Sequence, residues 1–509
     1  MDERYIAAVD LGTSKIAVTV AQCNSKGVQI LYYKESPSEG IRNTYVLNPQ
    51  KAANVVKEAI LDAENELRIK IHQVVTALPR YEVSQITANG GFERSDSESS
   101  ITREEIEFLK TNAIDTYPLQ DPTKQVIYGI VAQSFTTEEY LNARESDIEG
   151  MVSDTLEGNF KVFIGRKRHS DNVDRVMNNV GVAVAKKYFL PEITAKAVLS
   201  QEERENGVAL IEIGAGATSV TIYHNDIMRY YSSIPFGGNS ITNDIKLECG
   251  TSERLAENIK LGYGVCMPEK LLTLRDKILQ INNPESGSCK QLSVKYLSEV
   301  ITCRVKEIID ACLYKIQESG LGNTLRNGIV ITGGSAAIPN LSTYLKELSG
   351  YNIRIGYPRQ KFSFMGCPEV TETSAVASVG MIMAAKDDQY INCLSEAPVM
   401  KVERKEEPAA EEVIAAPETE SGTEYGIEPE TVTEPQWAPE QEPLQTEPAA
   451  KEPVIEEPEP VRVKTEKKAK EPRKKGPIIR WTNPFDNFTR KMSDRIGKII
   501  DNGYDGMED

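Results

Sequence analysis

Two stretches of the chain repeat one pattern, an apolar strand, a glycine-centred turn and a second strand. In residues 208–223 the apolar run ends at a Gly-Ala-Gly-Ala turn, after which apolar and polar side chains alternate. Residues 6–20 have the same order, with Asp10 just before the turn where the later stretch has Glu212. Alternation with a period of two residues is typical of a β-strand, so each stretch predicts a β-hairpin.

Both turns have the composition of an anion-binding loop. Glycine lets another molecule approach the backbone closely, and successive N–H groups form a concavity of anionic size. Alone, either stretch is as well explained by an ordinary hairpin, but the repeat indicates a duplicated fold with one phosphate loop in each half. The candidate loop residues are Gly12, Thr13, Ser14 and Lys15 in the first turn and Gly214, Ala215, Gly216 and Ala217 in the second.

A third glycine signal lies in residues 328–335, where an apolar strand ends in Gly333, Gly334 and Ser335. Backbone without side chains can lie flat against a base or a sugar. We therefore expect this segment to face a nucleoside beside the two phosphate loops.

The three signals, in this order, resemble the actin-like ATPase superfamily, and within it the FtsA family of bacterial cell-division proteins. The resemblance covers about residues 4–385 and implies an α/β, two-lobed, duplicated actin-like fold related to ribonuclease H. The stretches that carry it are VDLGTSKIAVTVA, GMVSDTLEGNFKVFIGR, GVALIEIGAGATSVTIY, IPFGGNSITNDIK and GIVITGGSAAIPNL.

The resemblance implies that the lobes bind ATP and magnesium between them. Asp10 would organise the magnesium shell, and Lys15 would neutralise phosphate charge. Glu257 and Lys260, which share one face of a predicted helix, would contact the ribose and the base. A surface ion pair is the alternative for these two side chains.

The second loop departs from the family pattern, which has Asp before the turn and Thr after its last glycine. Here these positions hold Glu212 and Ala217. The extra methylene of Glu212, the candidate catalytic carboxylate, displaces its charge, and an error of that size costs about a hundredfold in rate. We therefore expect ATP binding with weak or no hydrolysis.

The spacing of the motifs predicts the domain organisation. Residues 1–83 and 166–200 would form the first lobe and 84–165 a small inserted α+β domain. Residues 201–386 would form the second lobe, with a subdomain at about 246–325. In the family the inserted domain contacts neighbouring subunits and later division proteins; a solvated lobe without a partner is the alternative. Apolar side chains at helical spacing predict helices at 48–67, 102–113, 170–184, 188–200, 252–262, 292–320 and 371–385.

The predicted helix 292–320 carries a candidate partner site. In the family this subdomain receives the C-terminal peptide of FtsZ, the tubulin-like division protein. Arg304 and Glu307 are the candidate contacts, and a solvated helix face is the alternative.

The composition changes sharply after the second lobe. Residues 401–460 contain 18 glutamates, 10 prolines and 4 basic residues. Such low hydrophobicity with high charge predicts a disordered linker, which we place at 387–477. Residues 461–498 carry 13 Lys or Arg against 4 Asp or Glu, so the sign of the charge reverses there.

The last segment, 478–509, predicts an amphipathic helix that lies in a membrane interface. Basic side chains flank its apolar stripe, and Trp481 precedes it at headgroup level. Docking in the groove of a partner and a short core helix are the alternatives. The stripe consists of Phe485, Phe488, Met492, Ile496, Ile499 and Ile500.

Charge and composition exclude several classes of protein. The formal net charge of −17 argues against a nucleic-acid binder. The eight cysteines form no CxxC pair, and the three histidines are scattered, which argues against a zinc site. The sequence shows neither an apolar run of transmembrane length nor a signal peptide, so any membrane contact is expected to be peripheral.

The resemblance and the tail together predict a protein that polymerises and tethers the FtsZ ring to the cytoplasmic face of the cell membrane at the division site. Its expected partners are the FtsZ peptide, copies of itself, anionic lipid and later division proteins. A sugar-kinase relative, a pilus-assembly relative and a chaperone remain as alternatives. A kinase has no use for a lipid-binding tip, and the acidic segment cannot serve as a chaperone's substrate domain.

Overall fold

The computed structural model describes residues 3–394, except 95, 97, 272–275, 283–288 and 360. The side chains of residues 282, 289 and 290 are also not described. The chain divides into two units, 1–407 and 408–509, and the description below concerns the first. The predicted linker beyond 394 and the predicted amphipathic helix lie outside the described residues.

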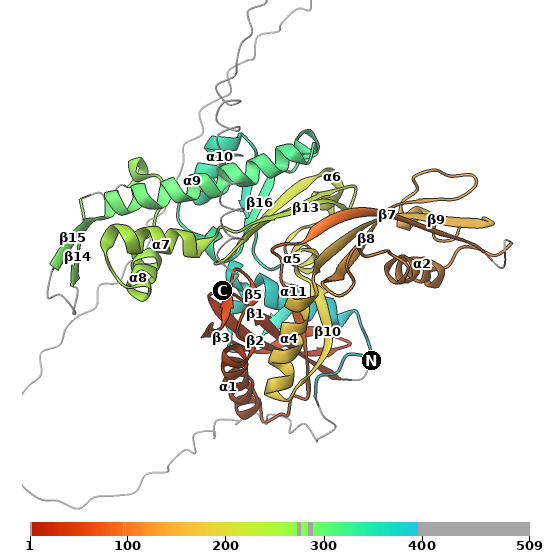
Figure 1. Ribbon diagram of the computed structural model, residues 1–509, viewed down its shortest axis with the longest axis horizontal. Coiled ribbons are helices and arrows are strands. Elements are labelled where there is room, and N and C mark those ends of the chain that lie inside the picture. The colour runs from red at the N-terminus through yellow and green to blue at the C-terminus, as the bar shows by residue number, and fades with distance from the viewer. Residues whose placement is uncertain are drawn as a thin grey trace, which may run out of the picture. The chain divides into compact units, whose positions relative to one another are not determined.

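Two sheets with the same internal order form the centre of the first unit (Figure 1). In each, a strand pairs with an antiparallel meander on one side and with a later parallel strand on the other. The first sheet has the order β10-β6-β1-β2-β3-β18 and the second β13-β12-β11-β16-β17. The repeated order β6-β1-β2-β3 and β16-β11-β12-β13 confirms the predicted duplication.

The strands of the first sheet are β1 (Arg4–Leu11), β2 (Lys15–Asn24), β3 (Gly27–Pro37), β6 (Gln73–Leu78), β10 (Ala183–Phe189) and β18 (Phe362–Phe364). Those of the second are β11 (Val208–Ile213), β12 (Thr218–His224), β13 (Ile227–Ile234), β16 (Ile329–Thr332) and β17 (Ile353–Ile355). A short hairpin, β4 (Ile41–Arg42) and β5 (Tyr45–Val46), follows β3.

The two predicted hairpins are present, in matching register. Asp10 faces Ala17 across the first hairpin, one pair before its turn. Glu212 faces Ser219 at the same position of the second hairpin. The two carboxylates are thus structurally equivalent, each one residue before the end of its strand.

Helices cover the first sheet. The helices α1 (Pro49–Leu67) and α4 (Lys167–Val180) lie side by side (Figure 1). The Asn48 side chain accepts a hydrogen bond from the N–H of Lys51 and begins α1, as capping residues do. The core beneath includes the buried Val56, Ile60 and Val176.

The prediction for 170–200 was partly wrong. Helix α4 ends at Val180, because Gly181 has the left-handed φ of 89° that stops a helix. The next residues form β10, which pairs in parallel with β6. The following helix, α5 (Leu190–Val198), therefore begins only at Leu190.

The region between the two phosphate loops has its own sheet, β7-β9-β8, and its own core. The core includes Leu109, Phe135 and Phe160. Thr102 and Glu105 form the expected capping box at the start of α2. The elements are β7 (Ser84–Glu93), α2 (Arg103–Asp115), β8 (Gln125–Thr136), α3 (Glu145–Ile148) and β9 (Thr155–Arg166).

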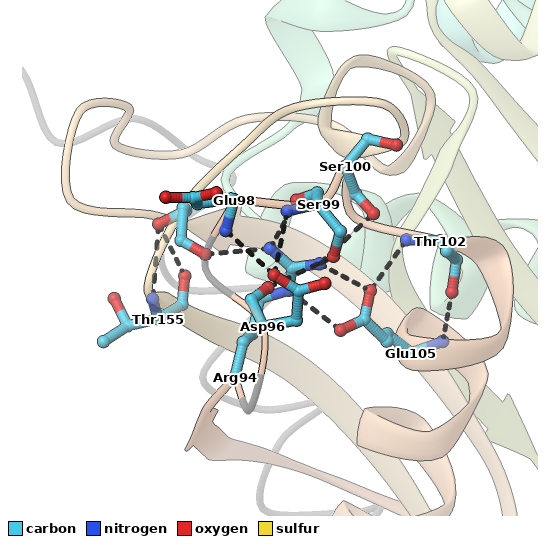
Figure 2. A network of polar contacts seen from close by, with 9 residues as sticks. Arg94, Asp96, Glu98, Ser99, Ser100, Thr102, Glu105 and Thr155 are labelled. Atoms are coloured by element: carbon cyan, nitrogen blue, oxygen red, sulfur yellow. Dashed lines mark hydrogen bonds and ion pairs between the residues drawn. The ribbon is translucent and has the colours of Figure 1, made fainter.

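A buried arginine fixes the loop between β7 and α2 (Figure 2). The Arg94 side chain donates to both carboxylate oxygens of Glu105, at 2.8 and 3.1 Å. It also donates to the carbonyls of Ser99 and Ser153. This network joins the capping box of α2 to the segment that precedes β9.

Helices dominate the subdomain inserted in the second half (Figure 1). The long helix α9 begins at Val294, two residues later than predicted, because Ser293 caps it and belongs to the preceding hairpin. The elements of this subdomain are α7 (Gly238–Cys249), α8 (Glu253–Tyr263), η1 (Pro268–Lys270), β14 (Ile278–Asn282), β15 (Cys289–Ser293) and α9 (Val294–Glu318).

Shorter elements complete the unit. They are α6 (Gln201–Asn206), η2 (Gly322–Thr324), η3 (Gly334–Ala337), α10 (Leu341–Ser349), η4 (Pro368–Thr371), η5 (Thr373–Ala375) and α11 (Val376–Lys386). The predicted closing helix 371–385 thus consists of two short 3₁₀ turns followed by α11. None of the helices in the described part of the chain combines the length and apolar character needed to cross a bilayer.

The body extends further than expected after α11. The N–H of Cys393 donates to the carbonyl of Tyr5, and the N–H of His72 donates to the carbonyl of Cys393. Ile71 and Leu394 form a β-bridge. The expectation that the linker begins at 387 is therefore wrong, because these hydrogen bonds join the segment up to Leu394 to the first lobe.

Candidate functional site

A cavity of about 1110 Å³ lies where both hairpin turns and the third glycine segment meet. Most of the predicted site residues line it, although the sequence separates them widely. They are Asp10, Gly12, Thr13, Ser14, Lys15, Glu212, Gly214, Ala215, Glu257, Lys260, Gly333, Gly334 and Ser335.

Two hydrogen bonds from nearby segments of the chain fix the first turn. The N–H of Ser38 donates to the Ser14 carbonyl (3.0 Å), and the N–H of Thr44 donates to Oγ1 of Thr13 (2.8 Å). Lys15, the expected phosphate cation, is paired with Glu35 on β3. A phosphate at this turn must therefore compete with Glu35 for the lysine.

The second turn packs against the start of α7. The N–H groups of Gly238 and Asn239 donate to the carbonyls of Gly214 and Ala215, at 2.9 and 2.8 Å. A Cβ atom at Gly216 would lie 2.6 Å from Oγ1 of Thr13, so the two turns touch. Glycine is needed at this contact because any side chain would separate the loops.

Two predicted phosphate residues, Gly216 and Ala217, are not among those that line the cavity. Ala217 is fully buried, and its carbonyl accepts from the N–H of Gly214 (3.1 Å) within the turn. Both residues shape the turn beneath the cavity. A Thr hydroxyl at position 217 would therefore enter packed interior.

The residues expected to contact ribose and base form one polar cluster. The Lys260 ammonium donates to Oε2 of Glu257 (2.7 Å), to Oγ1 of Thr242 (2.8 Å) and to the carbonyl of Gly238 (3.2 Å). Because Lys260 is tied to the backbone of α7, the pair is part of the cavity wall rather than an isolated surface ion pair. Ser335 joins this cluster to the second turn, since its hydroxyl donates to the Gly214 carbonyl at 3.5 Å.

Sequence analysis missed Arg80, which forms a buried ion pair with Glu212 in the same cavity. Arg80 follows β6, the strand parallel to β1. Parallel strands end at the same edge of a sheet, where ligands of α/β proteins bind. The sequence does contain one indication of this position, the short apolar strand that ends before Pro79. If that strand is parallel to β1, the residues after it lie at the same sheet edge as Asp10.

The carboxylates of the site are electrostatically coupled. Burial raises the pKa of Asp10 to about 6, although Lys15 and Arg80 oppose the shift, and Glu212 adds to it. Burial alone would lower the pKa of Arg80, but Glu212 and Asp10 raise it above its usual value. The cluster therefore favours a bound cation near Asp10.

The donor set suits magnesium only together with a ligand. Among the residues that the structure describes, no group of three or more His, Cys, Asp or Glu side chains could hold a metal ion. Magnesium typically takes one or two carboxylates, and phosphates and waters complete its octahedron. Asp10, which lines the cavity, provides one such carboxylate.

Glycines in the cavity lining also let a nucleotide lie close to the backbone. A Cβ atom at Gly334 would meet nothing nearer than 3.9 Å, which leaves open space beside the third glycine segment. At Gly238 a Cβ atom would lie 2.5 Å from Oγ of Ser335. The residues present therefore fit a nucleoside polyphosphate.

The candidate partner residues lie outside the cavity, on α9. Arg304 donates to both carboxylate oxygens of Asp244 on α7, at 2.5 and 2.9 Å, and to Glu307 at 2.6 Å. Arg304 thus ties α9 to α7. The predicted membrane residues, Trp481 to Ile500, lie outside the described residues.

Comparisons with known proteins agree with this geometry. The model of the family described as cell division protein FtsA matches residues 209–380. FtsA of Neisseria meningitidis serogroup B is 28% identical over 363 residues, which cover 70% of this chain and 85% of that protein. FtsA of Borreliella burgdorferi is 28% identical over 408 residues, which cover 80% and 96%.

A comparison with solved structures supports the fold through one match with a TM-score above 0.5, given first below. The type IV pilus biogenesis complex PilM–PilN superposes with a TM-score of 0.52 at 16% identity, covering 74% of this chain and 98% of that chain. MreB5 of Spiroplasma citri bound to AMPPNP gives a TM-score of 0.46 at 13% identity, covering 76% and 97%. The chain is thus similar over residues 209–380 to the FtsA family of cell-division proteins, and its duplicated sheets and paired turns have the actin-like α/β fold.

Proposed function

We propose that this protein binds Mg-ATP between its two sheets, polymerises on the membrane and tethers the FtsZ ring there, where it helps to recruit later division proteins. The observation that carries the nucleotide part is the convergence of two equivalent acid-and-glycine turns and a third glycine segment on one cavity. Sequence relatives named for cell division support the remainder.

In this proposal each element of the cavity has one role. The backbone of residues 12–15 and 214–215 cradles the phosphates, and Lys15 leaves Glu35 to neutralise them. Glu257 and Lys260 contact the ribose and base beside the flat backbone of Gly333 and Gly334. Magnesium, when bound, neutralises phosphate charge, and Asp10 orients its water shell.

Slow or absent hydrolysis is part of the proposal. A carboxylate that activates water needs free lone pairs within reach of that water. The extra methylene of Glu212 displaces its carboxylate from the position that an Asp would give it, and an error of that size costs about a hundredfold in rate. The nucleotide would then stabilise one conformation for assembly, and its rapid turnover is not required.

We propose that the FtsZ peptide docks on the subdomain formed by α7, α8 and α9. Because Arg304 is engaged with Asp244, the exposed apolar side chains beside it are better contacts. Leu247 is 70% exposed, and the hydroxyl of Tyr296 donates to the neighbouring Glu248 at 2.8 Å. Exposed apolar side chains of this kind fit the nonpolar face of a short peptide.

Liposome co-sedimentation tests the whole proposal. The full chain is mixed with anionic vesicles, with and without ATP and FtsZ, and compared with a chain that ends at residue 477. We expect the full chain to sediment with vesicles, more so with ATP, and to carry FtsZ with it. If FtsZ sediments equally well without the full chain, the tether is excluded.

A further inference from the structure

The buried ion pair between Arg80 and Glu212 joins the two sheets at the floor of the cavity. Arg80 follows β6 of the first sheet, and Glu212 lies on β11 of the second. Their side chains are only 9% and 8% exposed. The hydroxyl of Tyr231, on β13, donates to the carbonyl of Arg80 and fixes its backbone from the second sheet.

The guanidinium lies directly against the second phosphate turn. A Cβ atom at Gly214 would clash with Nη2 of Arg80, so the guanidinium lies close to the backbone of this turn. Both Arg80 and Gly214 line the cavity. The guanidinium of Arg80 is therefore positioned to contact an anion bound at this turn.

The pair is incompletely bonded. Within the described part of the chain, Nε of Arg80 and Oε2 of Glu212 are buried without a hydrogen-bond partner. A guanidinium carries five donors in a rigid fork that matches a phosphate in two-point contact. An unsatisfied fork at a phosphate turn has the geometry of an anion subsite whose present occupant is a carboxylate.

We propose that Arg80 is the residue by which this cleft distinguishes nucleoside triphosphates from diphosphates, because its guanidinium contacts the terminal phosphate in place of Glu212. The inference rests on the proposed nucleotide site. In the proposed site Lys260 and Glu257, which are hydrogen-bonded to each other, contact the nucleoside. Asp10, Lys15, Arg80 and Glu212 form an electrostatically coupled cluster in the same cavity lining, to which we assign the terminal phosphate.

In this proposal the carboxylate of Glu212 and the terminal phosphate compete for the guanidinium of Arg80. The carboxylate holds the arginine in place before nucleotide binds, and the terminal phosphate must displace it at least partly. Removal of the negative charge of Glu212 should therefore strengthen ATP binding. A purely structural ion pair makes the opposite prediction, since loss of either partner would loosen the cleft.

The test is titration calorimetry of the full chain with Mg-ATP and with Mg-ADP. The variants are Glu212→Gln and the double variant Arg80→Met with Glu212→Gln, which removes both charges and so leaves no unpaired buried ion. The double variant should lose about tenfold or more in ATP affinity, as expected for one charge-assisted contact, while ADP changes about twofold or less. Glu212→Gln should bind ATP at least as tightly as the parent.

A control variant removes another Arg–Glu pair, more exposed than the first, elsewhere in the second lobe. Arg354 donates to both carboxylate oxygens of Glu203, at 2.5 and 2.7 Å. Arg354→Met with Glu203→Gln should leave both affinities unchanged. Equal effects of the Arg80 double variant on ATP and ADP, or none on either, would overturn the subsite. Failure of the parent to bind both nucleotides would instead refute the nucleotide site itself.

Discussion

Arg80 and Glu212 form a buried ion pair that connects the first sheet of this protein to the second. The pair occupies the position where the two phosphate turns meet, beside Asp10. Breaking such a pair by removing one partner typically costs about 3–5 kcal/mol, because the other charge stays buried and uncompensated. The cleft is therefore built around a charge arrangement that any bound phosphate must alter.

The first prediction concerns turnover. The unaltered protein should hydrolyse ATP slowly or not at all, and Glu212→Asp should raise the rate by up to about a hundredfold, because the shorter side chain removes the displacement of the carboxylate from the water it would orient. A phosphate-release assay measures this. Adding Ala217→Thr should not help, since that position is buried outside the cavity lining. Rapid turnover by the unaltered chain would contradict the account.

The second prediction concerns pH. His169 stacks on Tyr45 with ring centroids 3.8 Å apart, and burial lowers its pKa from 6.5 to about 4. The imidazole of His169 binds a proton more tightly in the unfolded chain than in the folded one. The stability that the folded protein has with this imidazole neutral is therefore fully present above pH 6.5, and it is lost as the pH falls toward 4.

His169→Phe keeps the ring but removes the titration. After allowance for partial exposure to solvent, we expect the free energy of unfolding to fall about 1–2 kcal/mol less between pH 7 and 4 in the variant. Urea unfolding at several pH values measures this. Identical pH profiles of parent and variant would show that His169 does not contribute.

The third prediction distinguishes a surface for the FtsZ peptide on α7 from a surface for self-association on the inserted domain. Leu247 on α7 and Leu141 in the inserted domain are 70% and 77% exposed. Leu247→Asp should weaken binding of the FtsZ C-terminal peptide by about tenfold, whereas Leu141→Asp should weaken ATP-dependent self-association, because a charge opposes burial in either contact. Each variant is the control for the other, in fluorescence anisotropy and in sedimentation. If both variants behave alike in both assays, the assignment of the surfaces is wrong.

The fourth prediction concerns the C-terminal segment. Phe488→Asp with Ile496→Asp places two charges on the predicted apolar stripe, and the full-length variant should bind ATP but stay in the supernatant with anionic liposomes. One helix gives weak attachment, because interfacial burial is partial and ordering costs about 1 kcal/mol or more per residue. Polymers should bind firmly, since linked tails raise the effective concentration. If the variant sediments as the parent does, the segment is not the anchor.

The duplicated hairpins were predictable because their signal is local. The alternation after each turn and the acid before it depend only on neighbouring residues. The same holds for the capping box at Thr102 and Glu105, which contact each other within one helical turn.

The parts that were missed depend on contacts between distant residues. Arg80 reaches Glu212 only because β6 joins the first sheet and Tyr231 fixes the loop that follows it. The strand β10 has no strong pattern of its own, and pairing with β6 decides its form. Likewise the contact of Arg304 with Asp244 joins two helices across 60 residues of sequence, so no local pattern indicates it.

ATP binding to the cleft, measured by titration calorimetry, tests the central claim most directly. In Gly334→Leu the new side chain projects from a cavity-lining position where a Cβ atom meets nothing closer than 3.9 Å, so it should block the nucleotide without disturbing the fold. Gly262→Leu, at a position with open space outside the cavity lining, is the control. We predict that the parent and Gly262→Leu bind Mg-ATP alike and that Gly334→Leu, with an unchanged unfolding temperature, loses about tenfold or more in affinity. Absence of binding by the parent, or equal affinity in all three proteins, would contradict the assignment of this cleft as a nucleotide site.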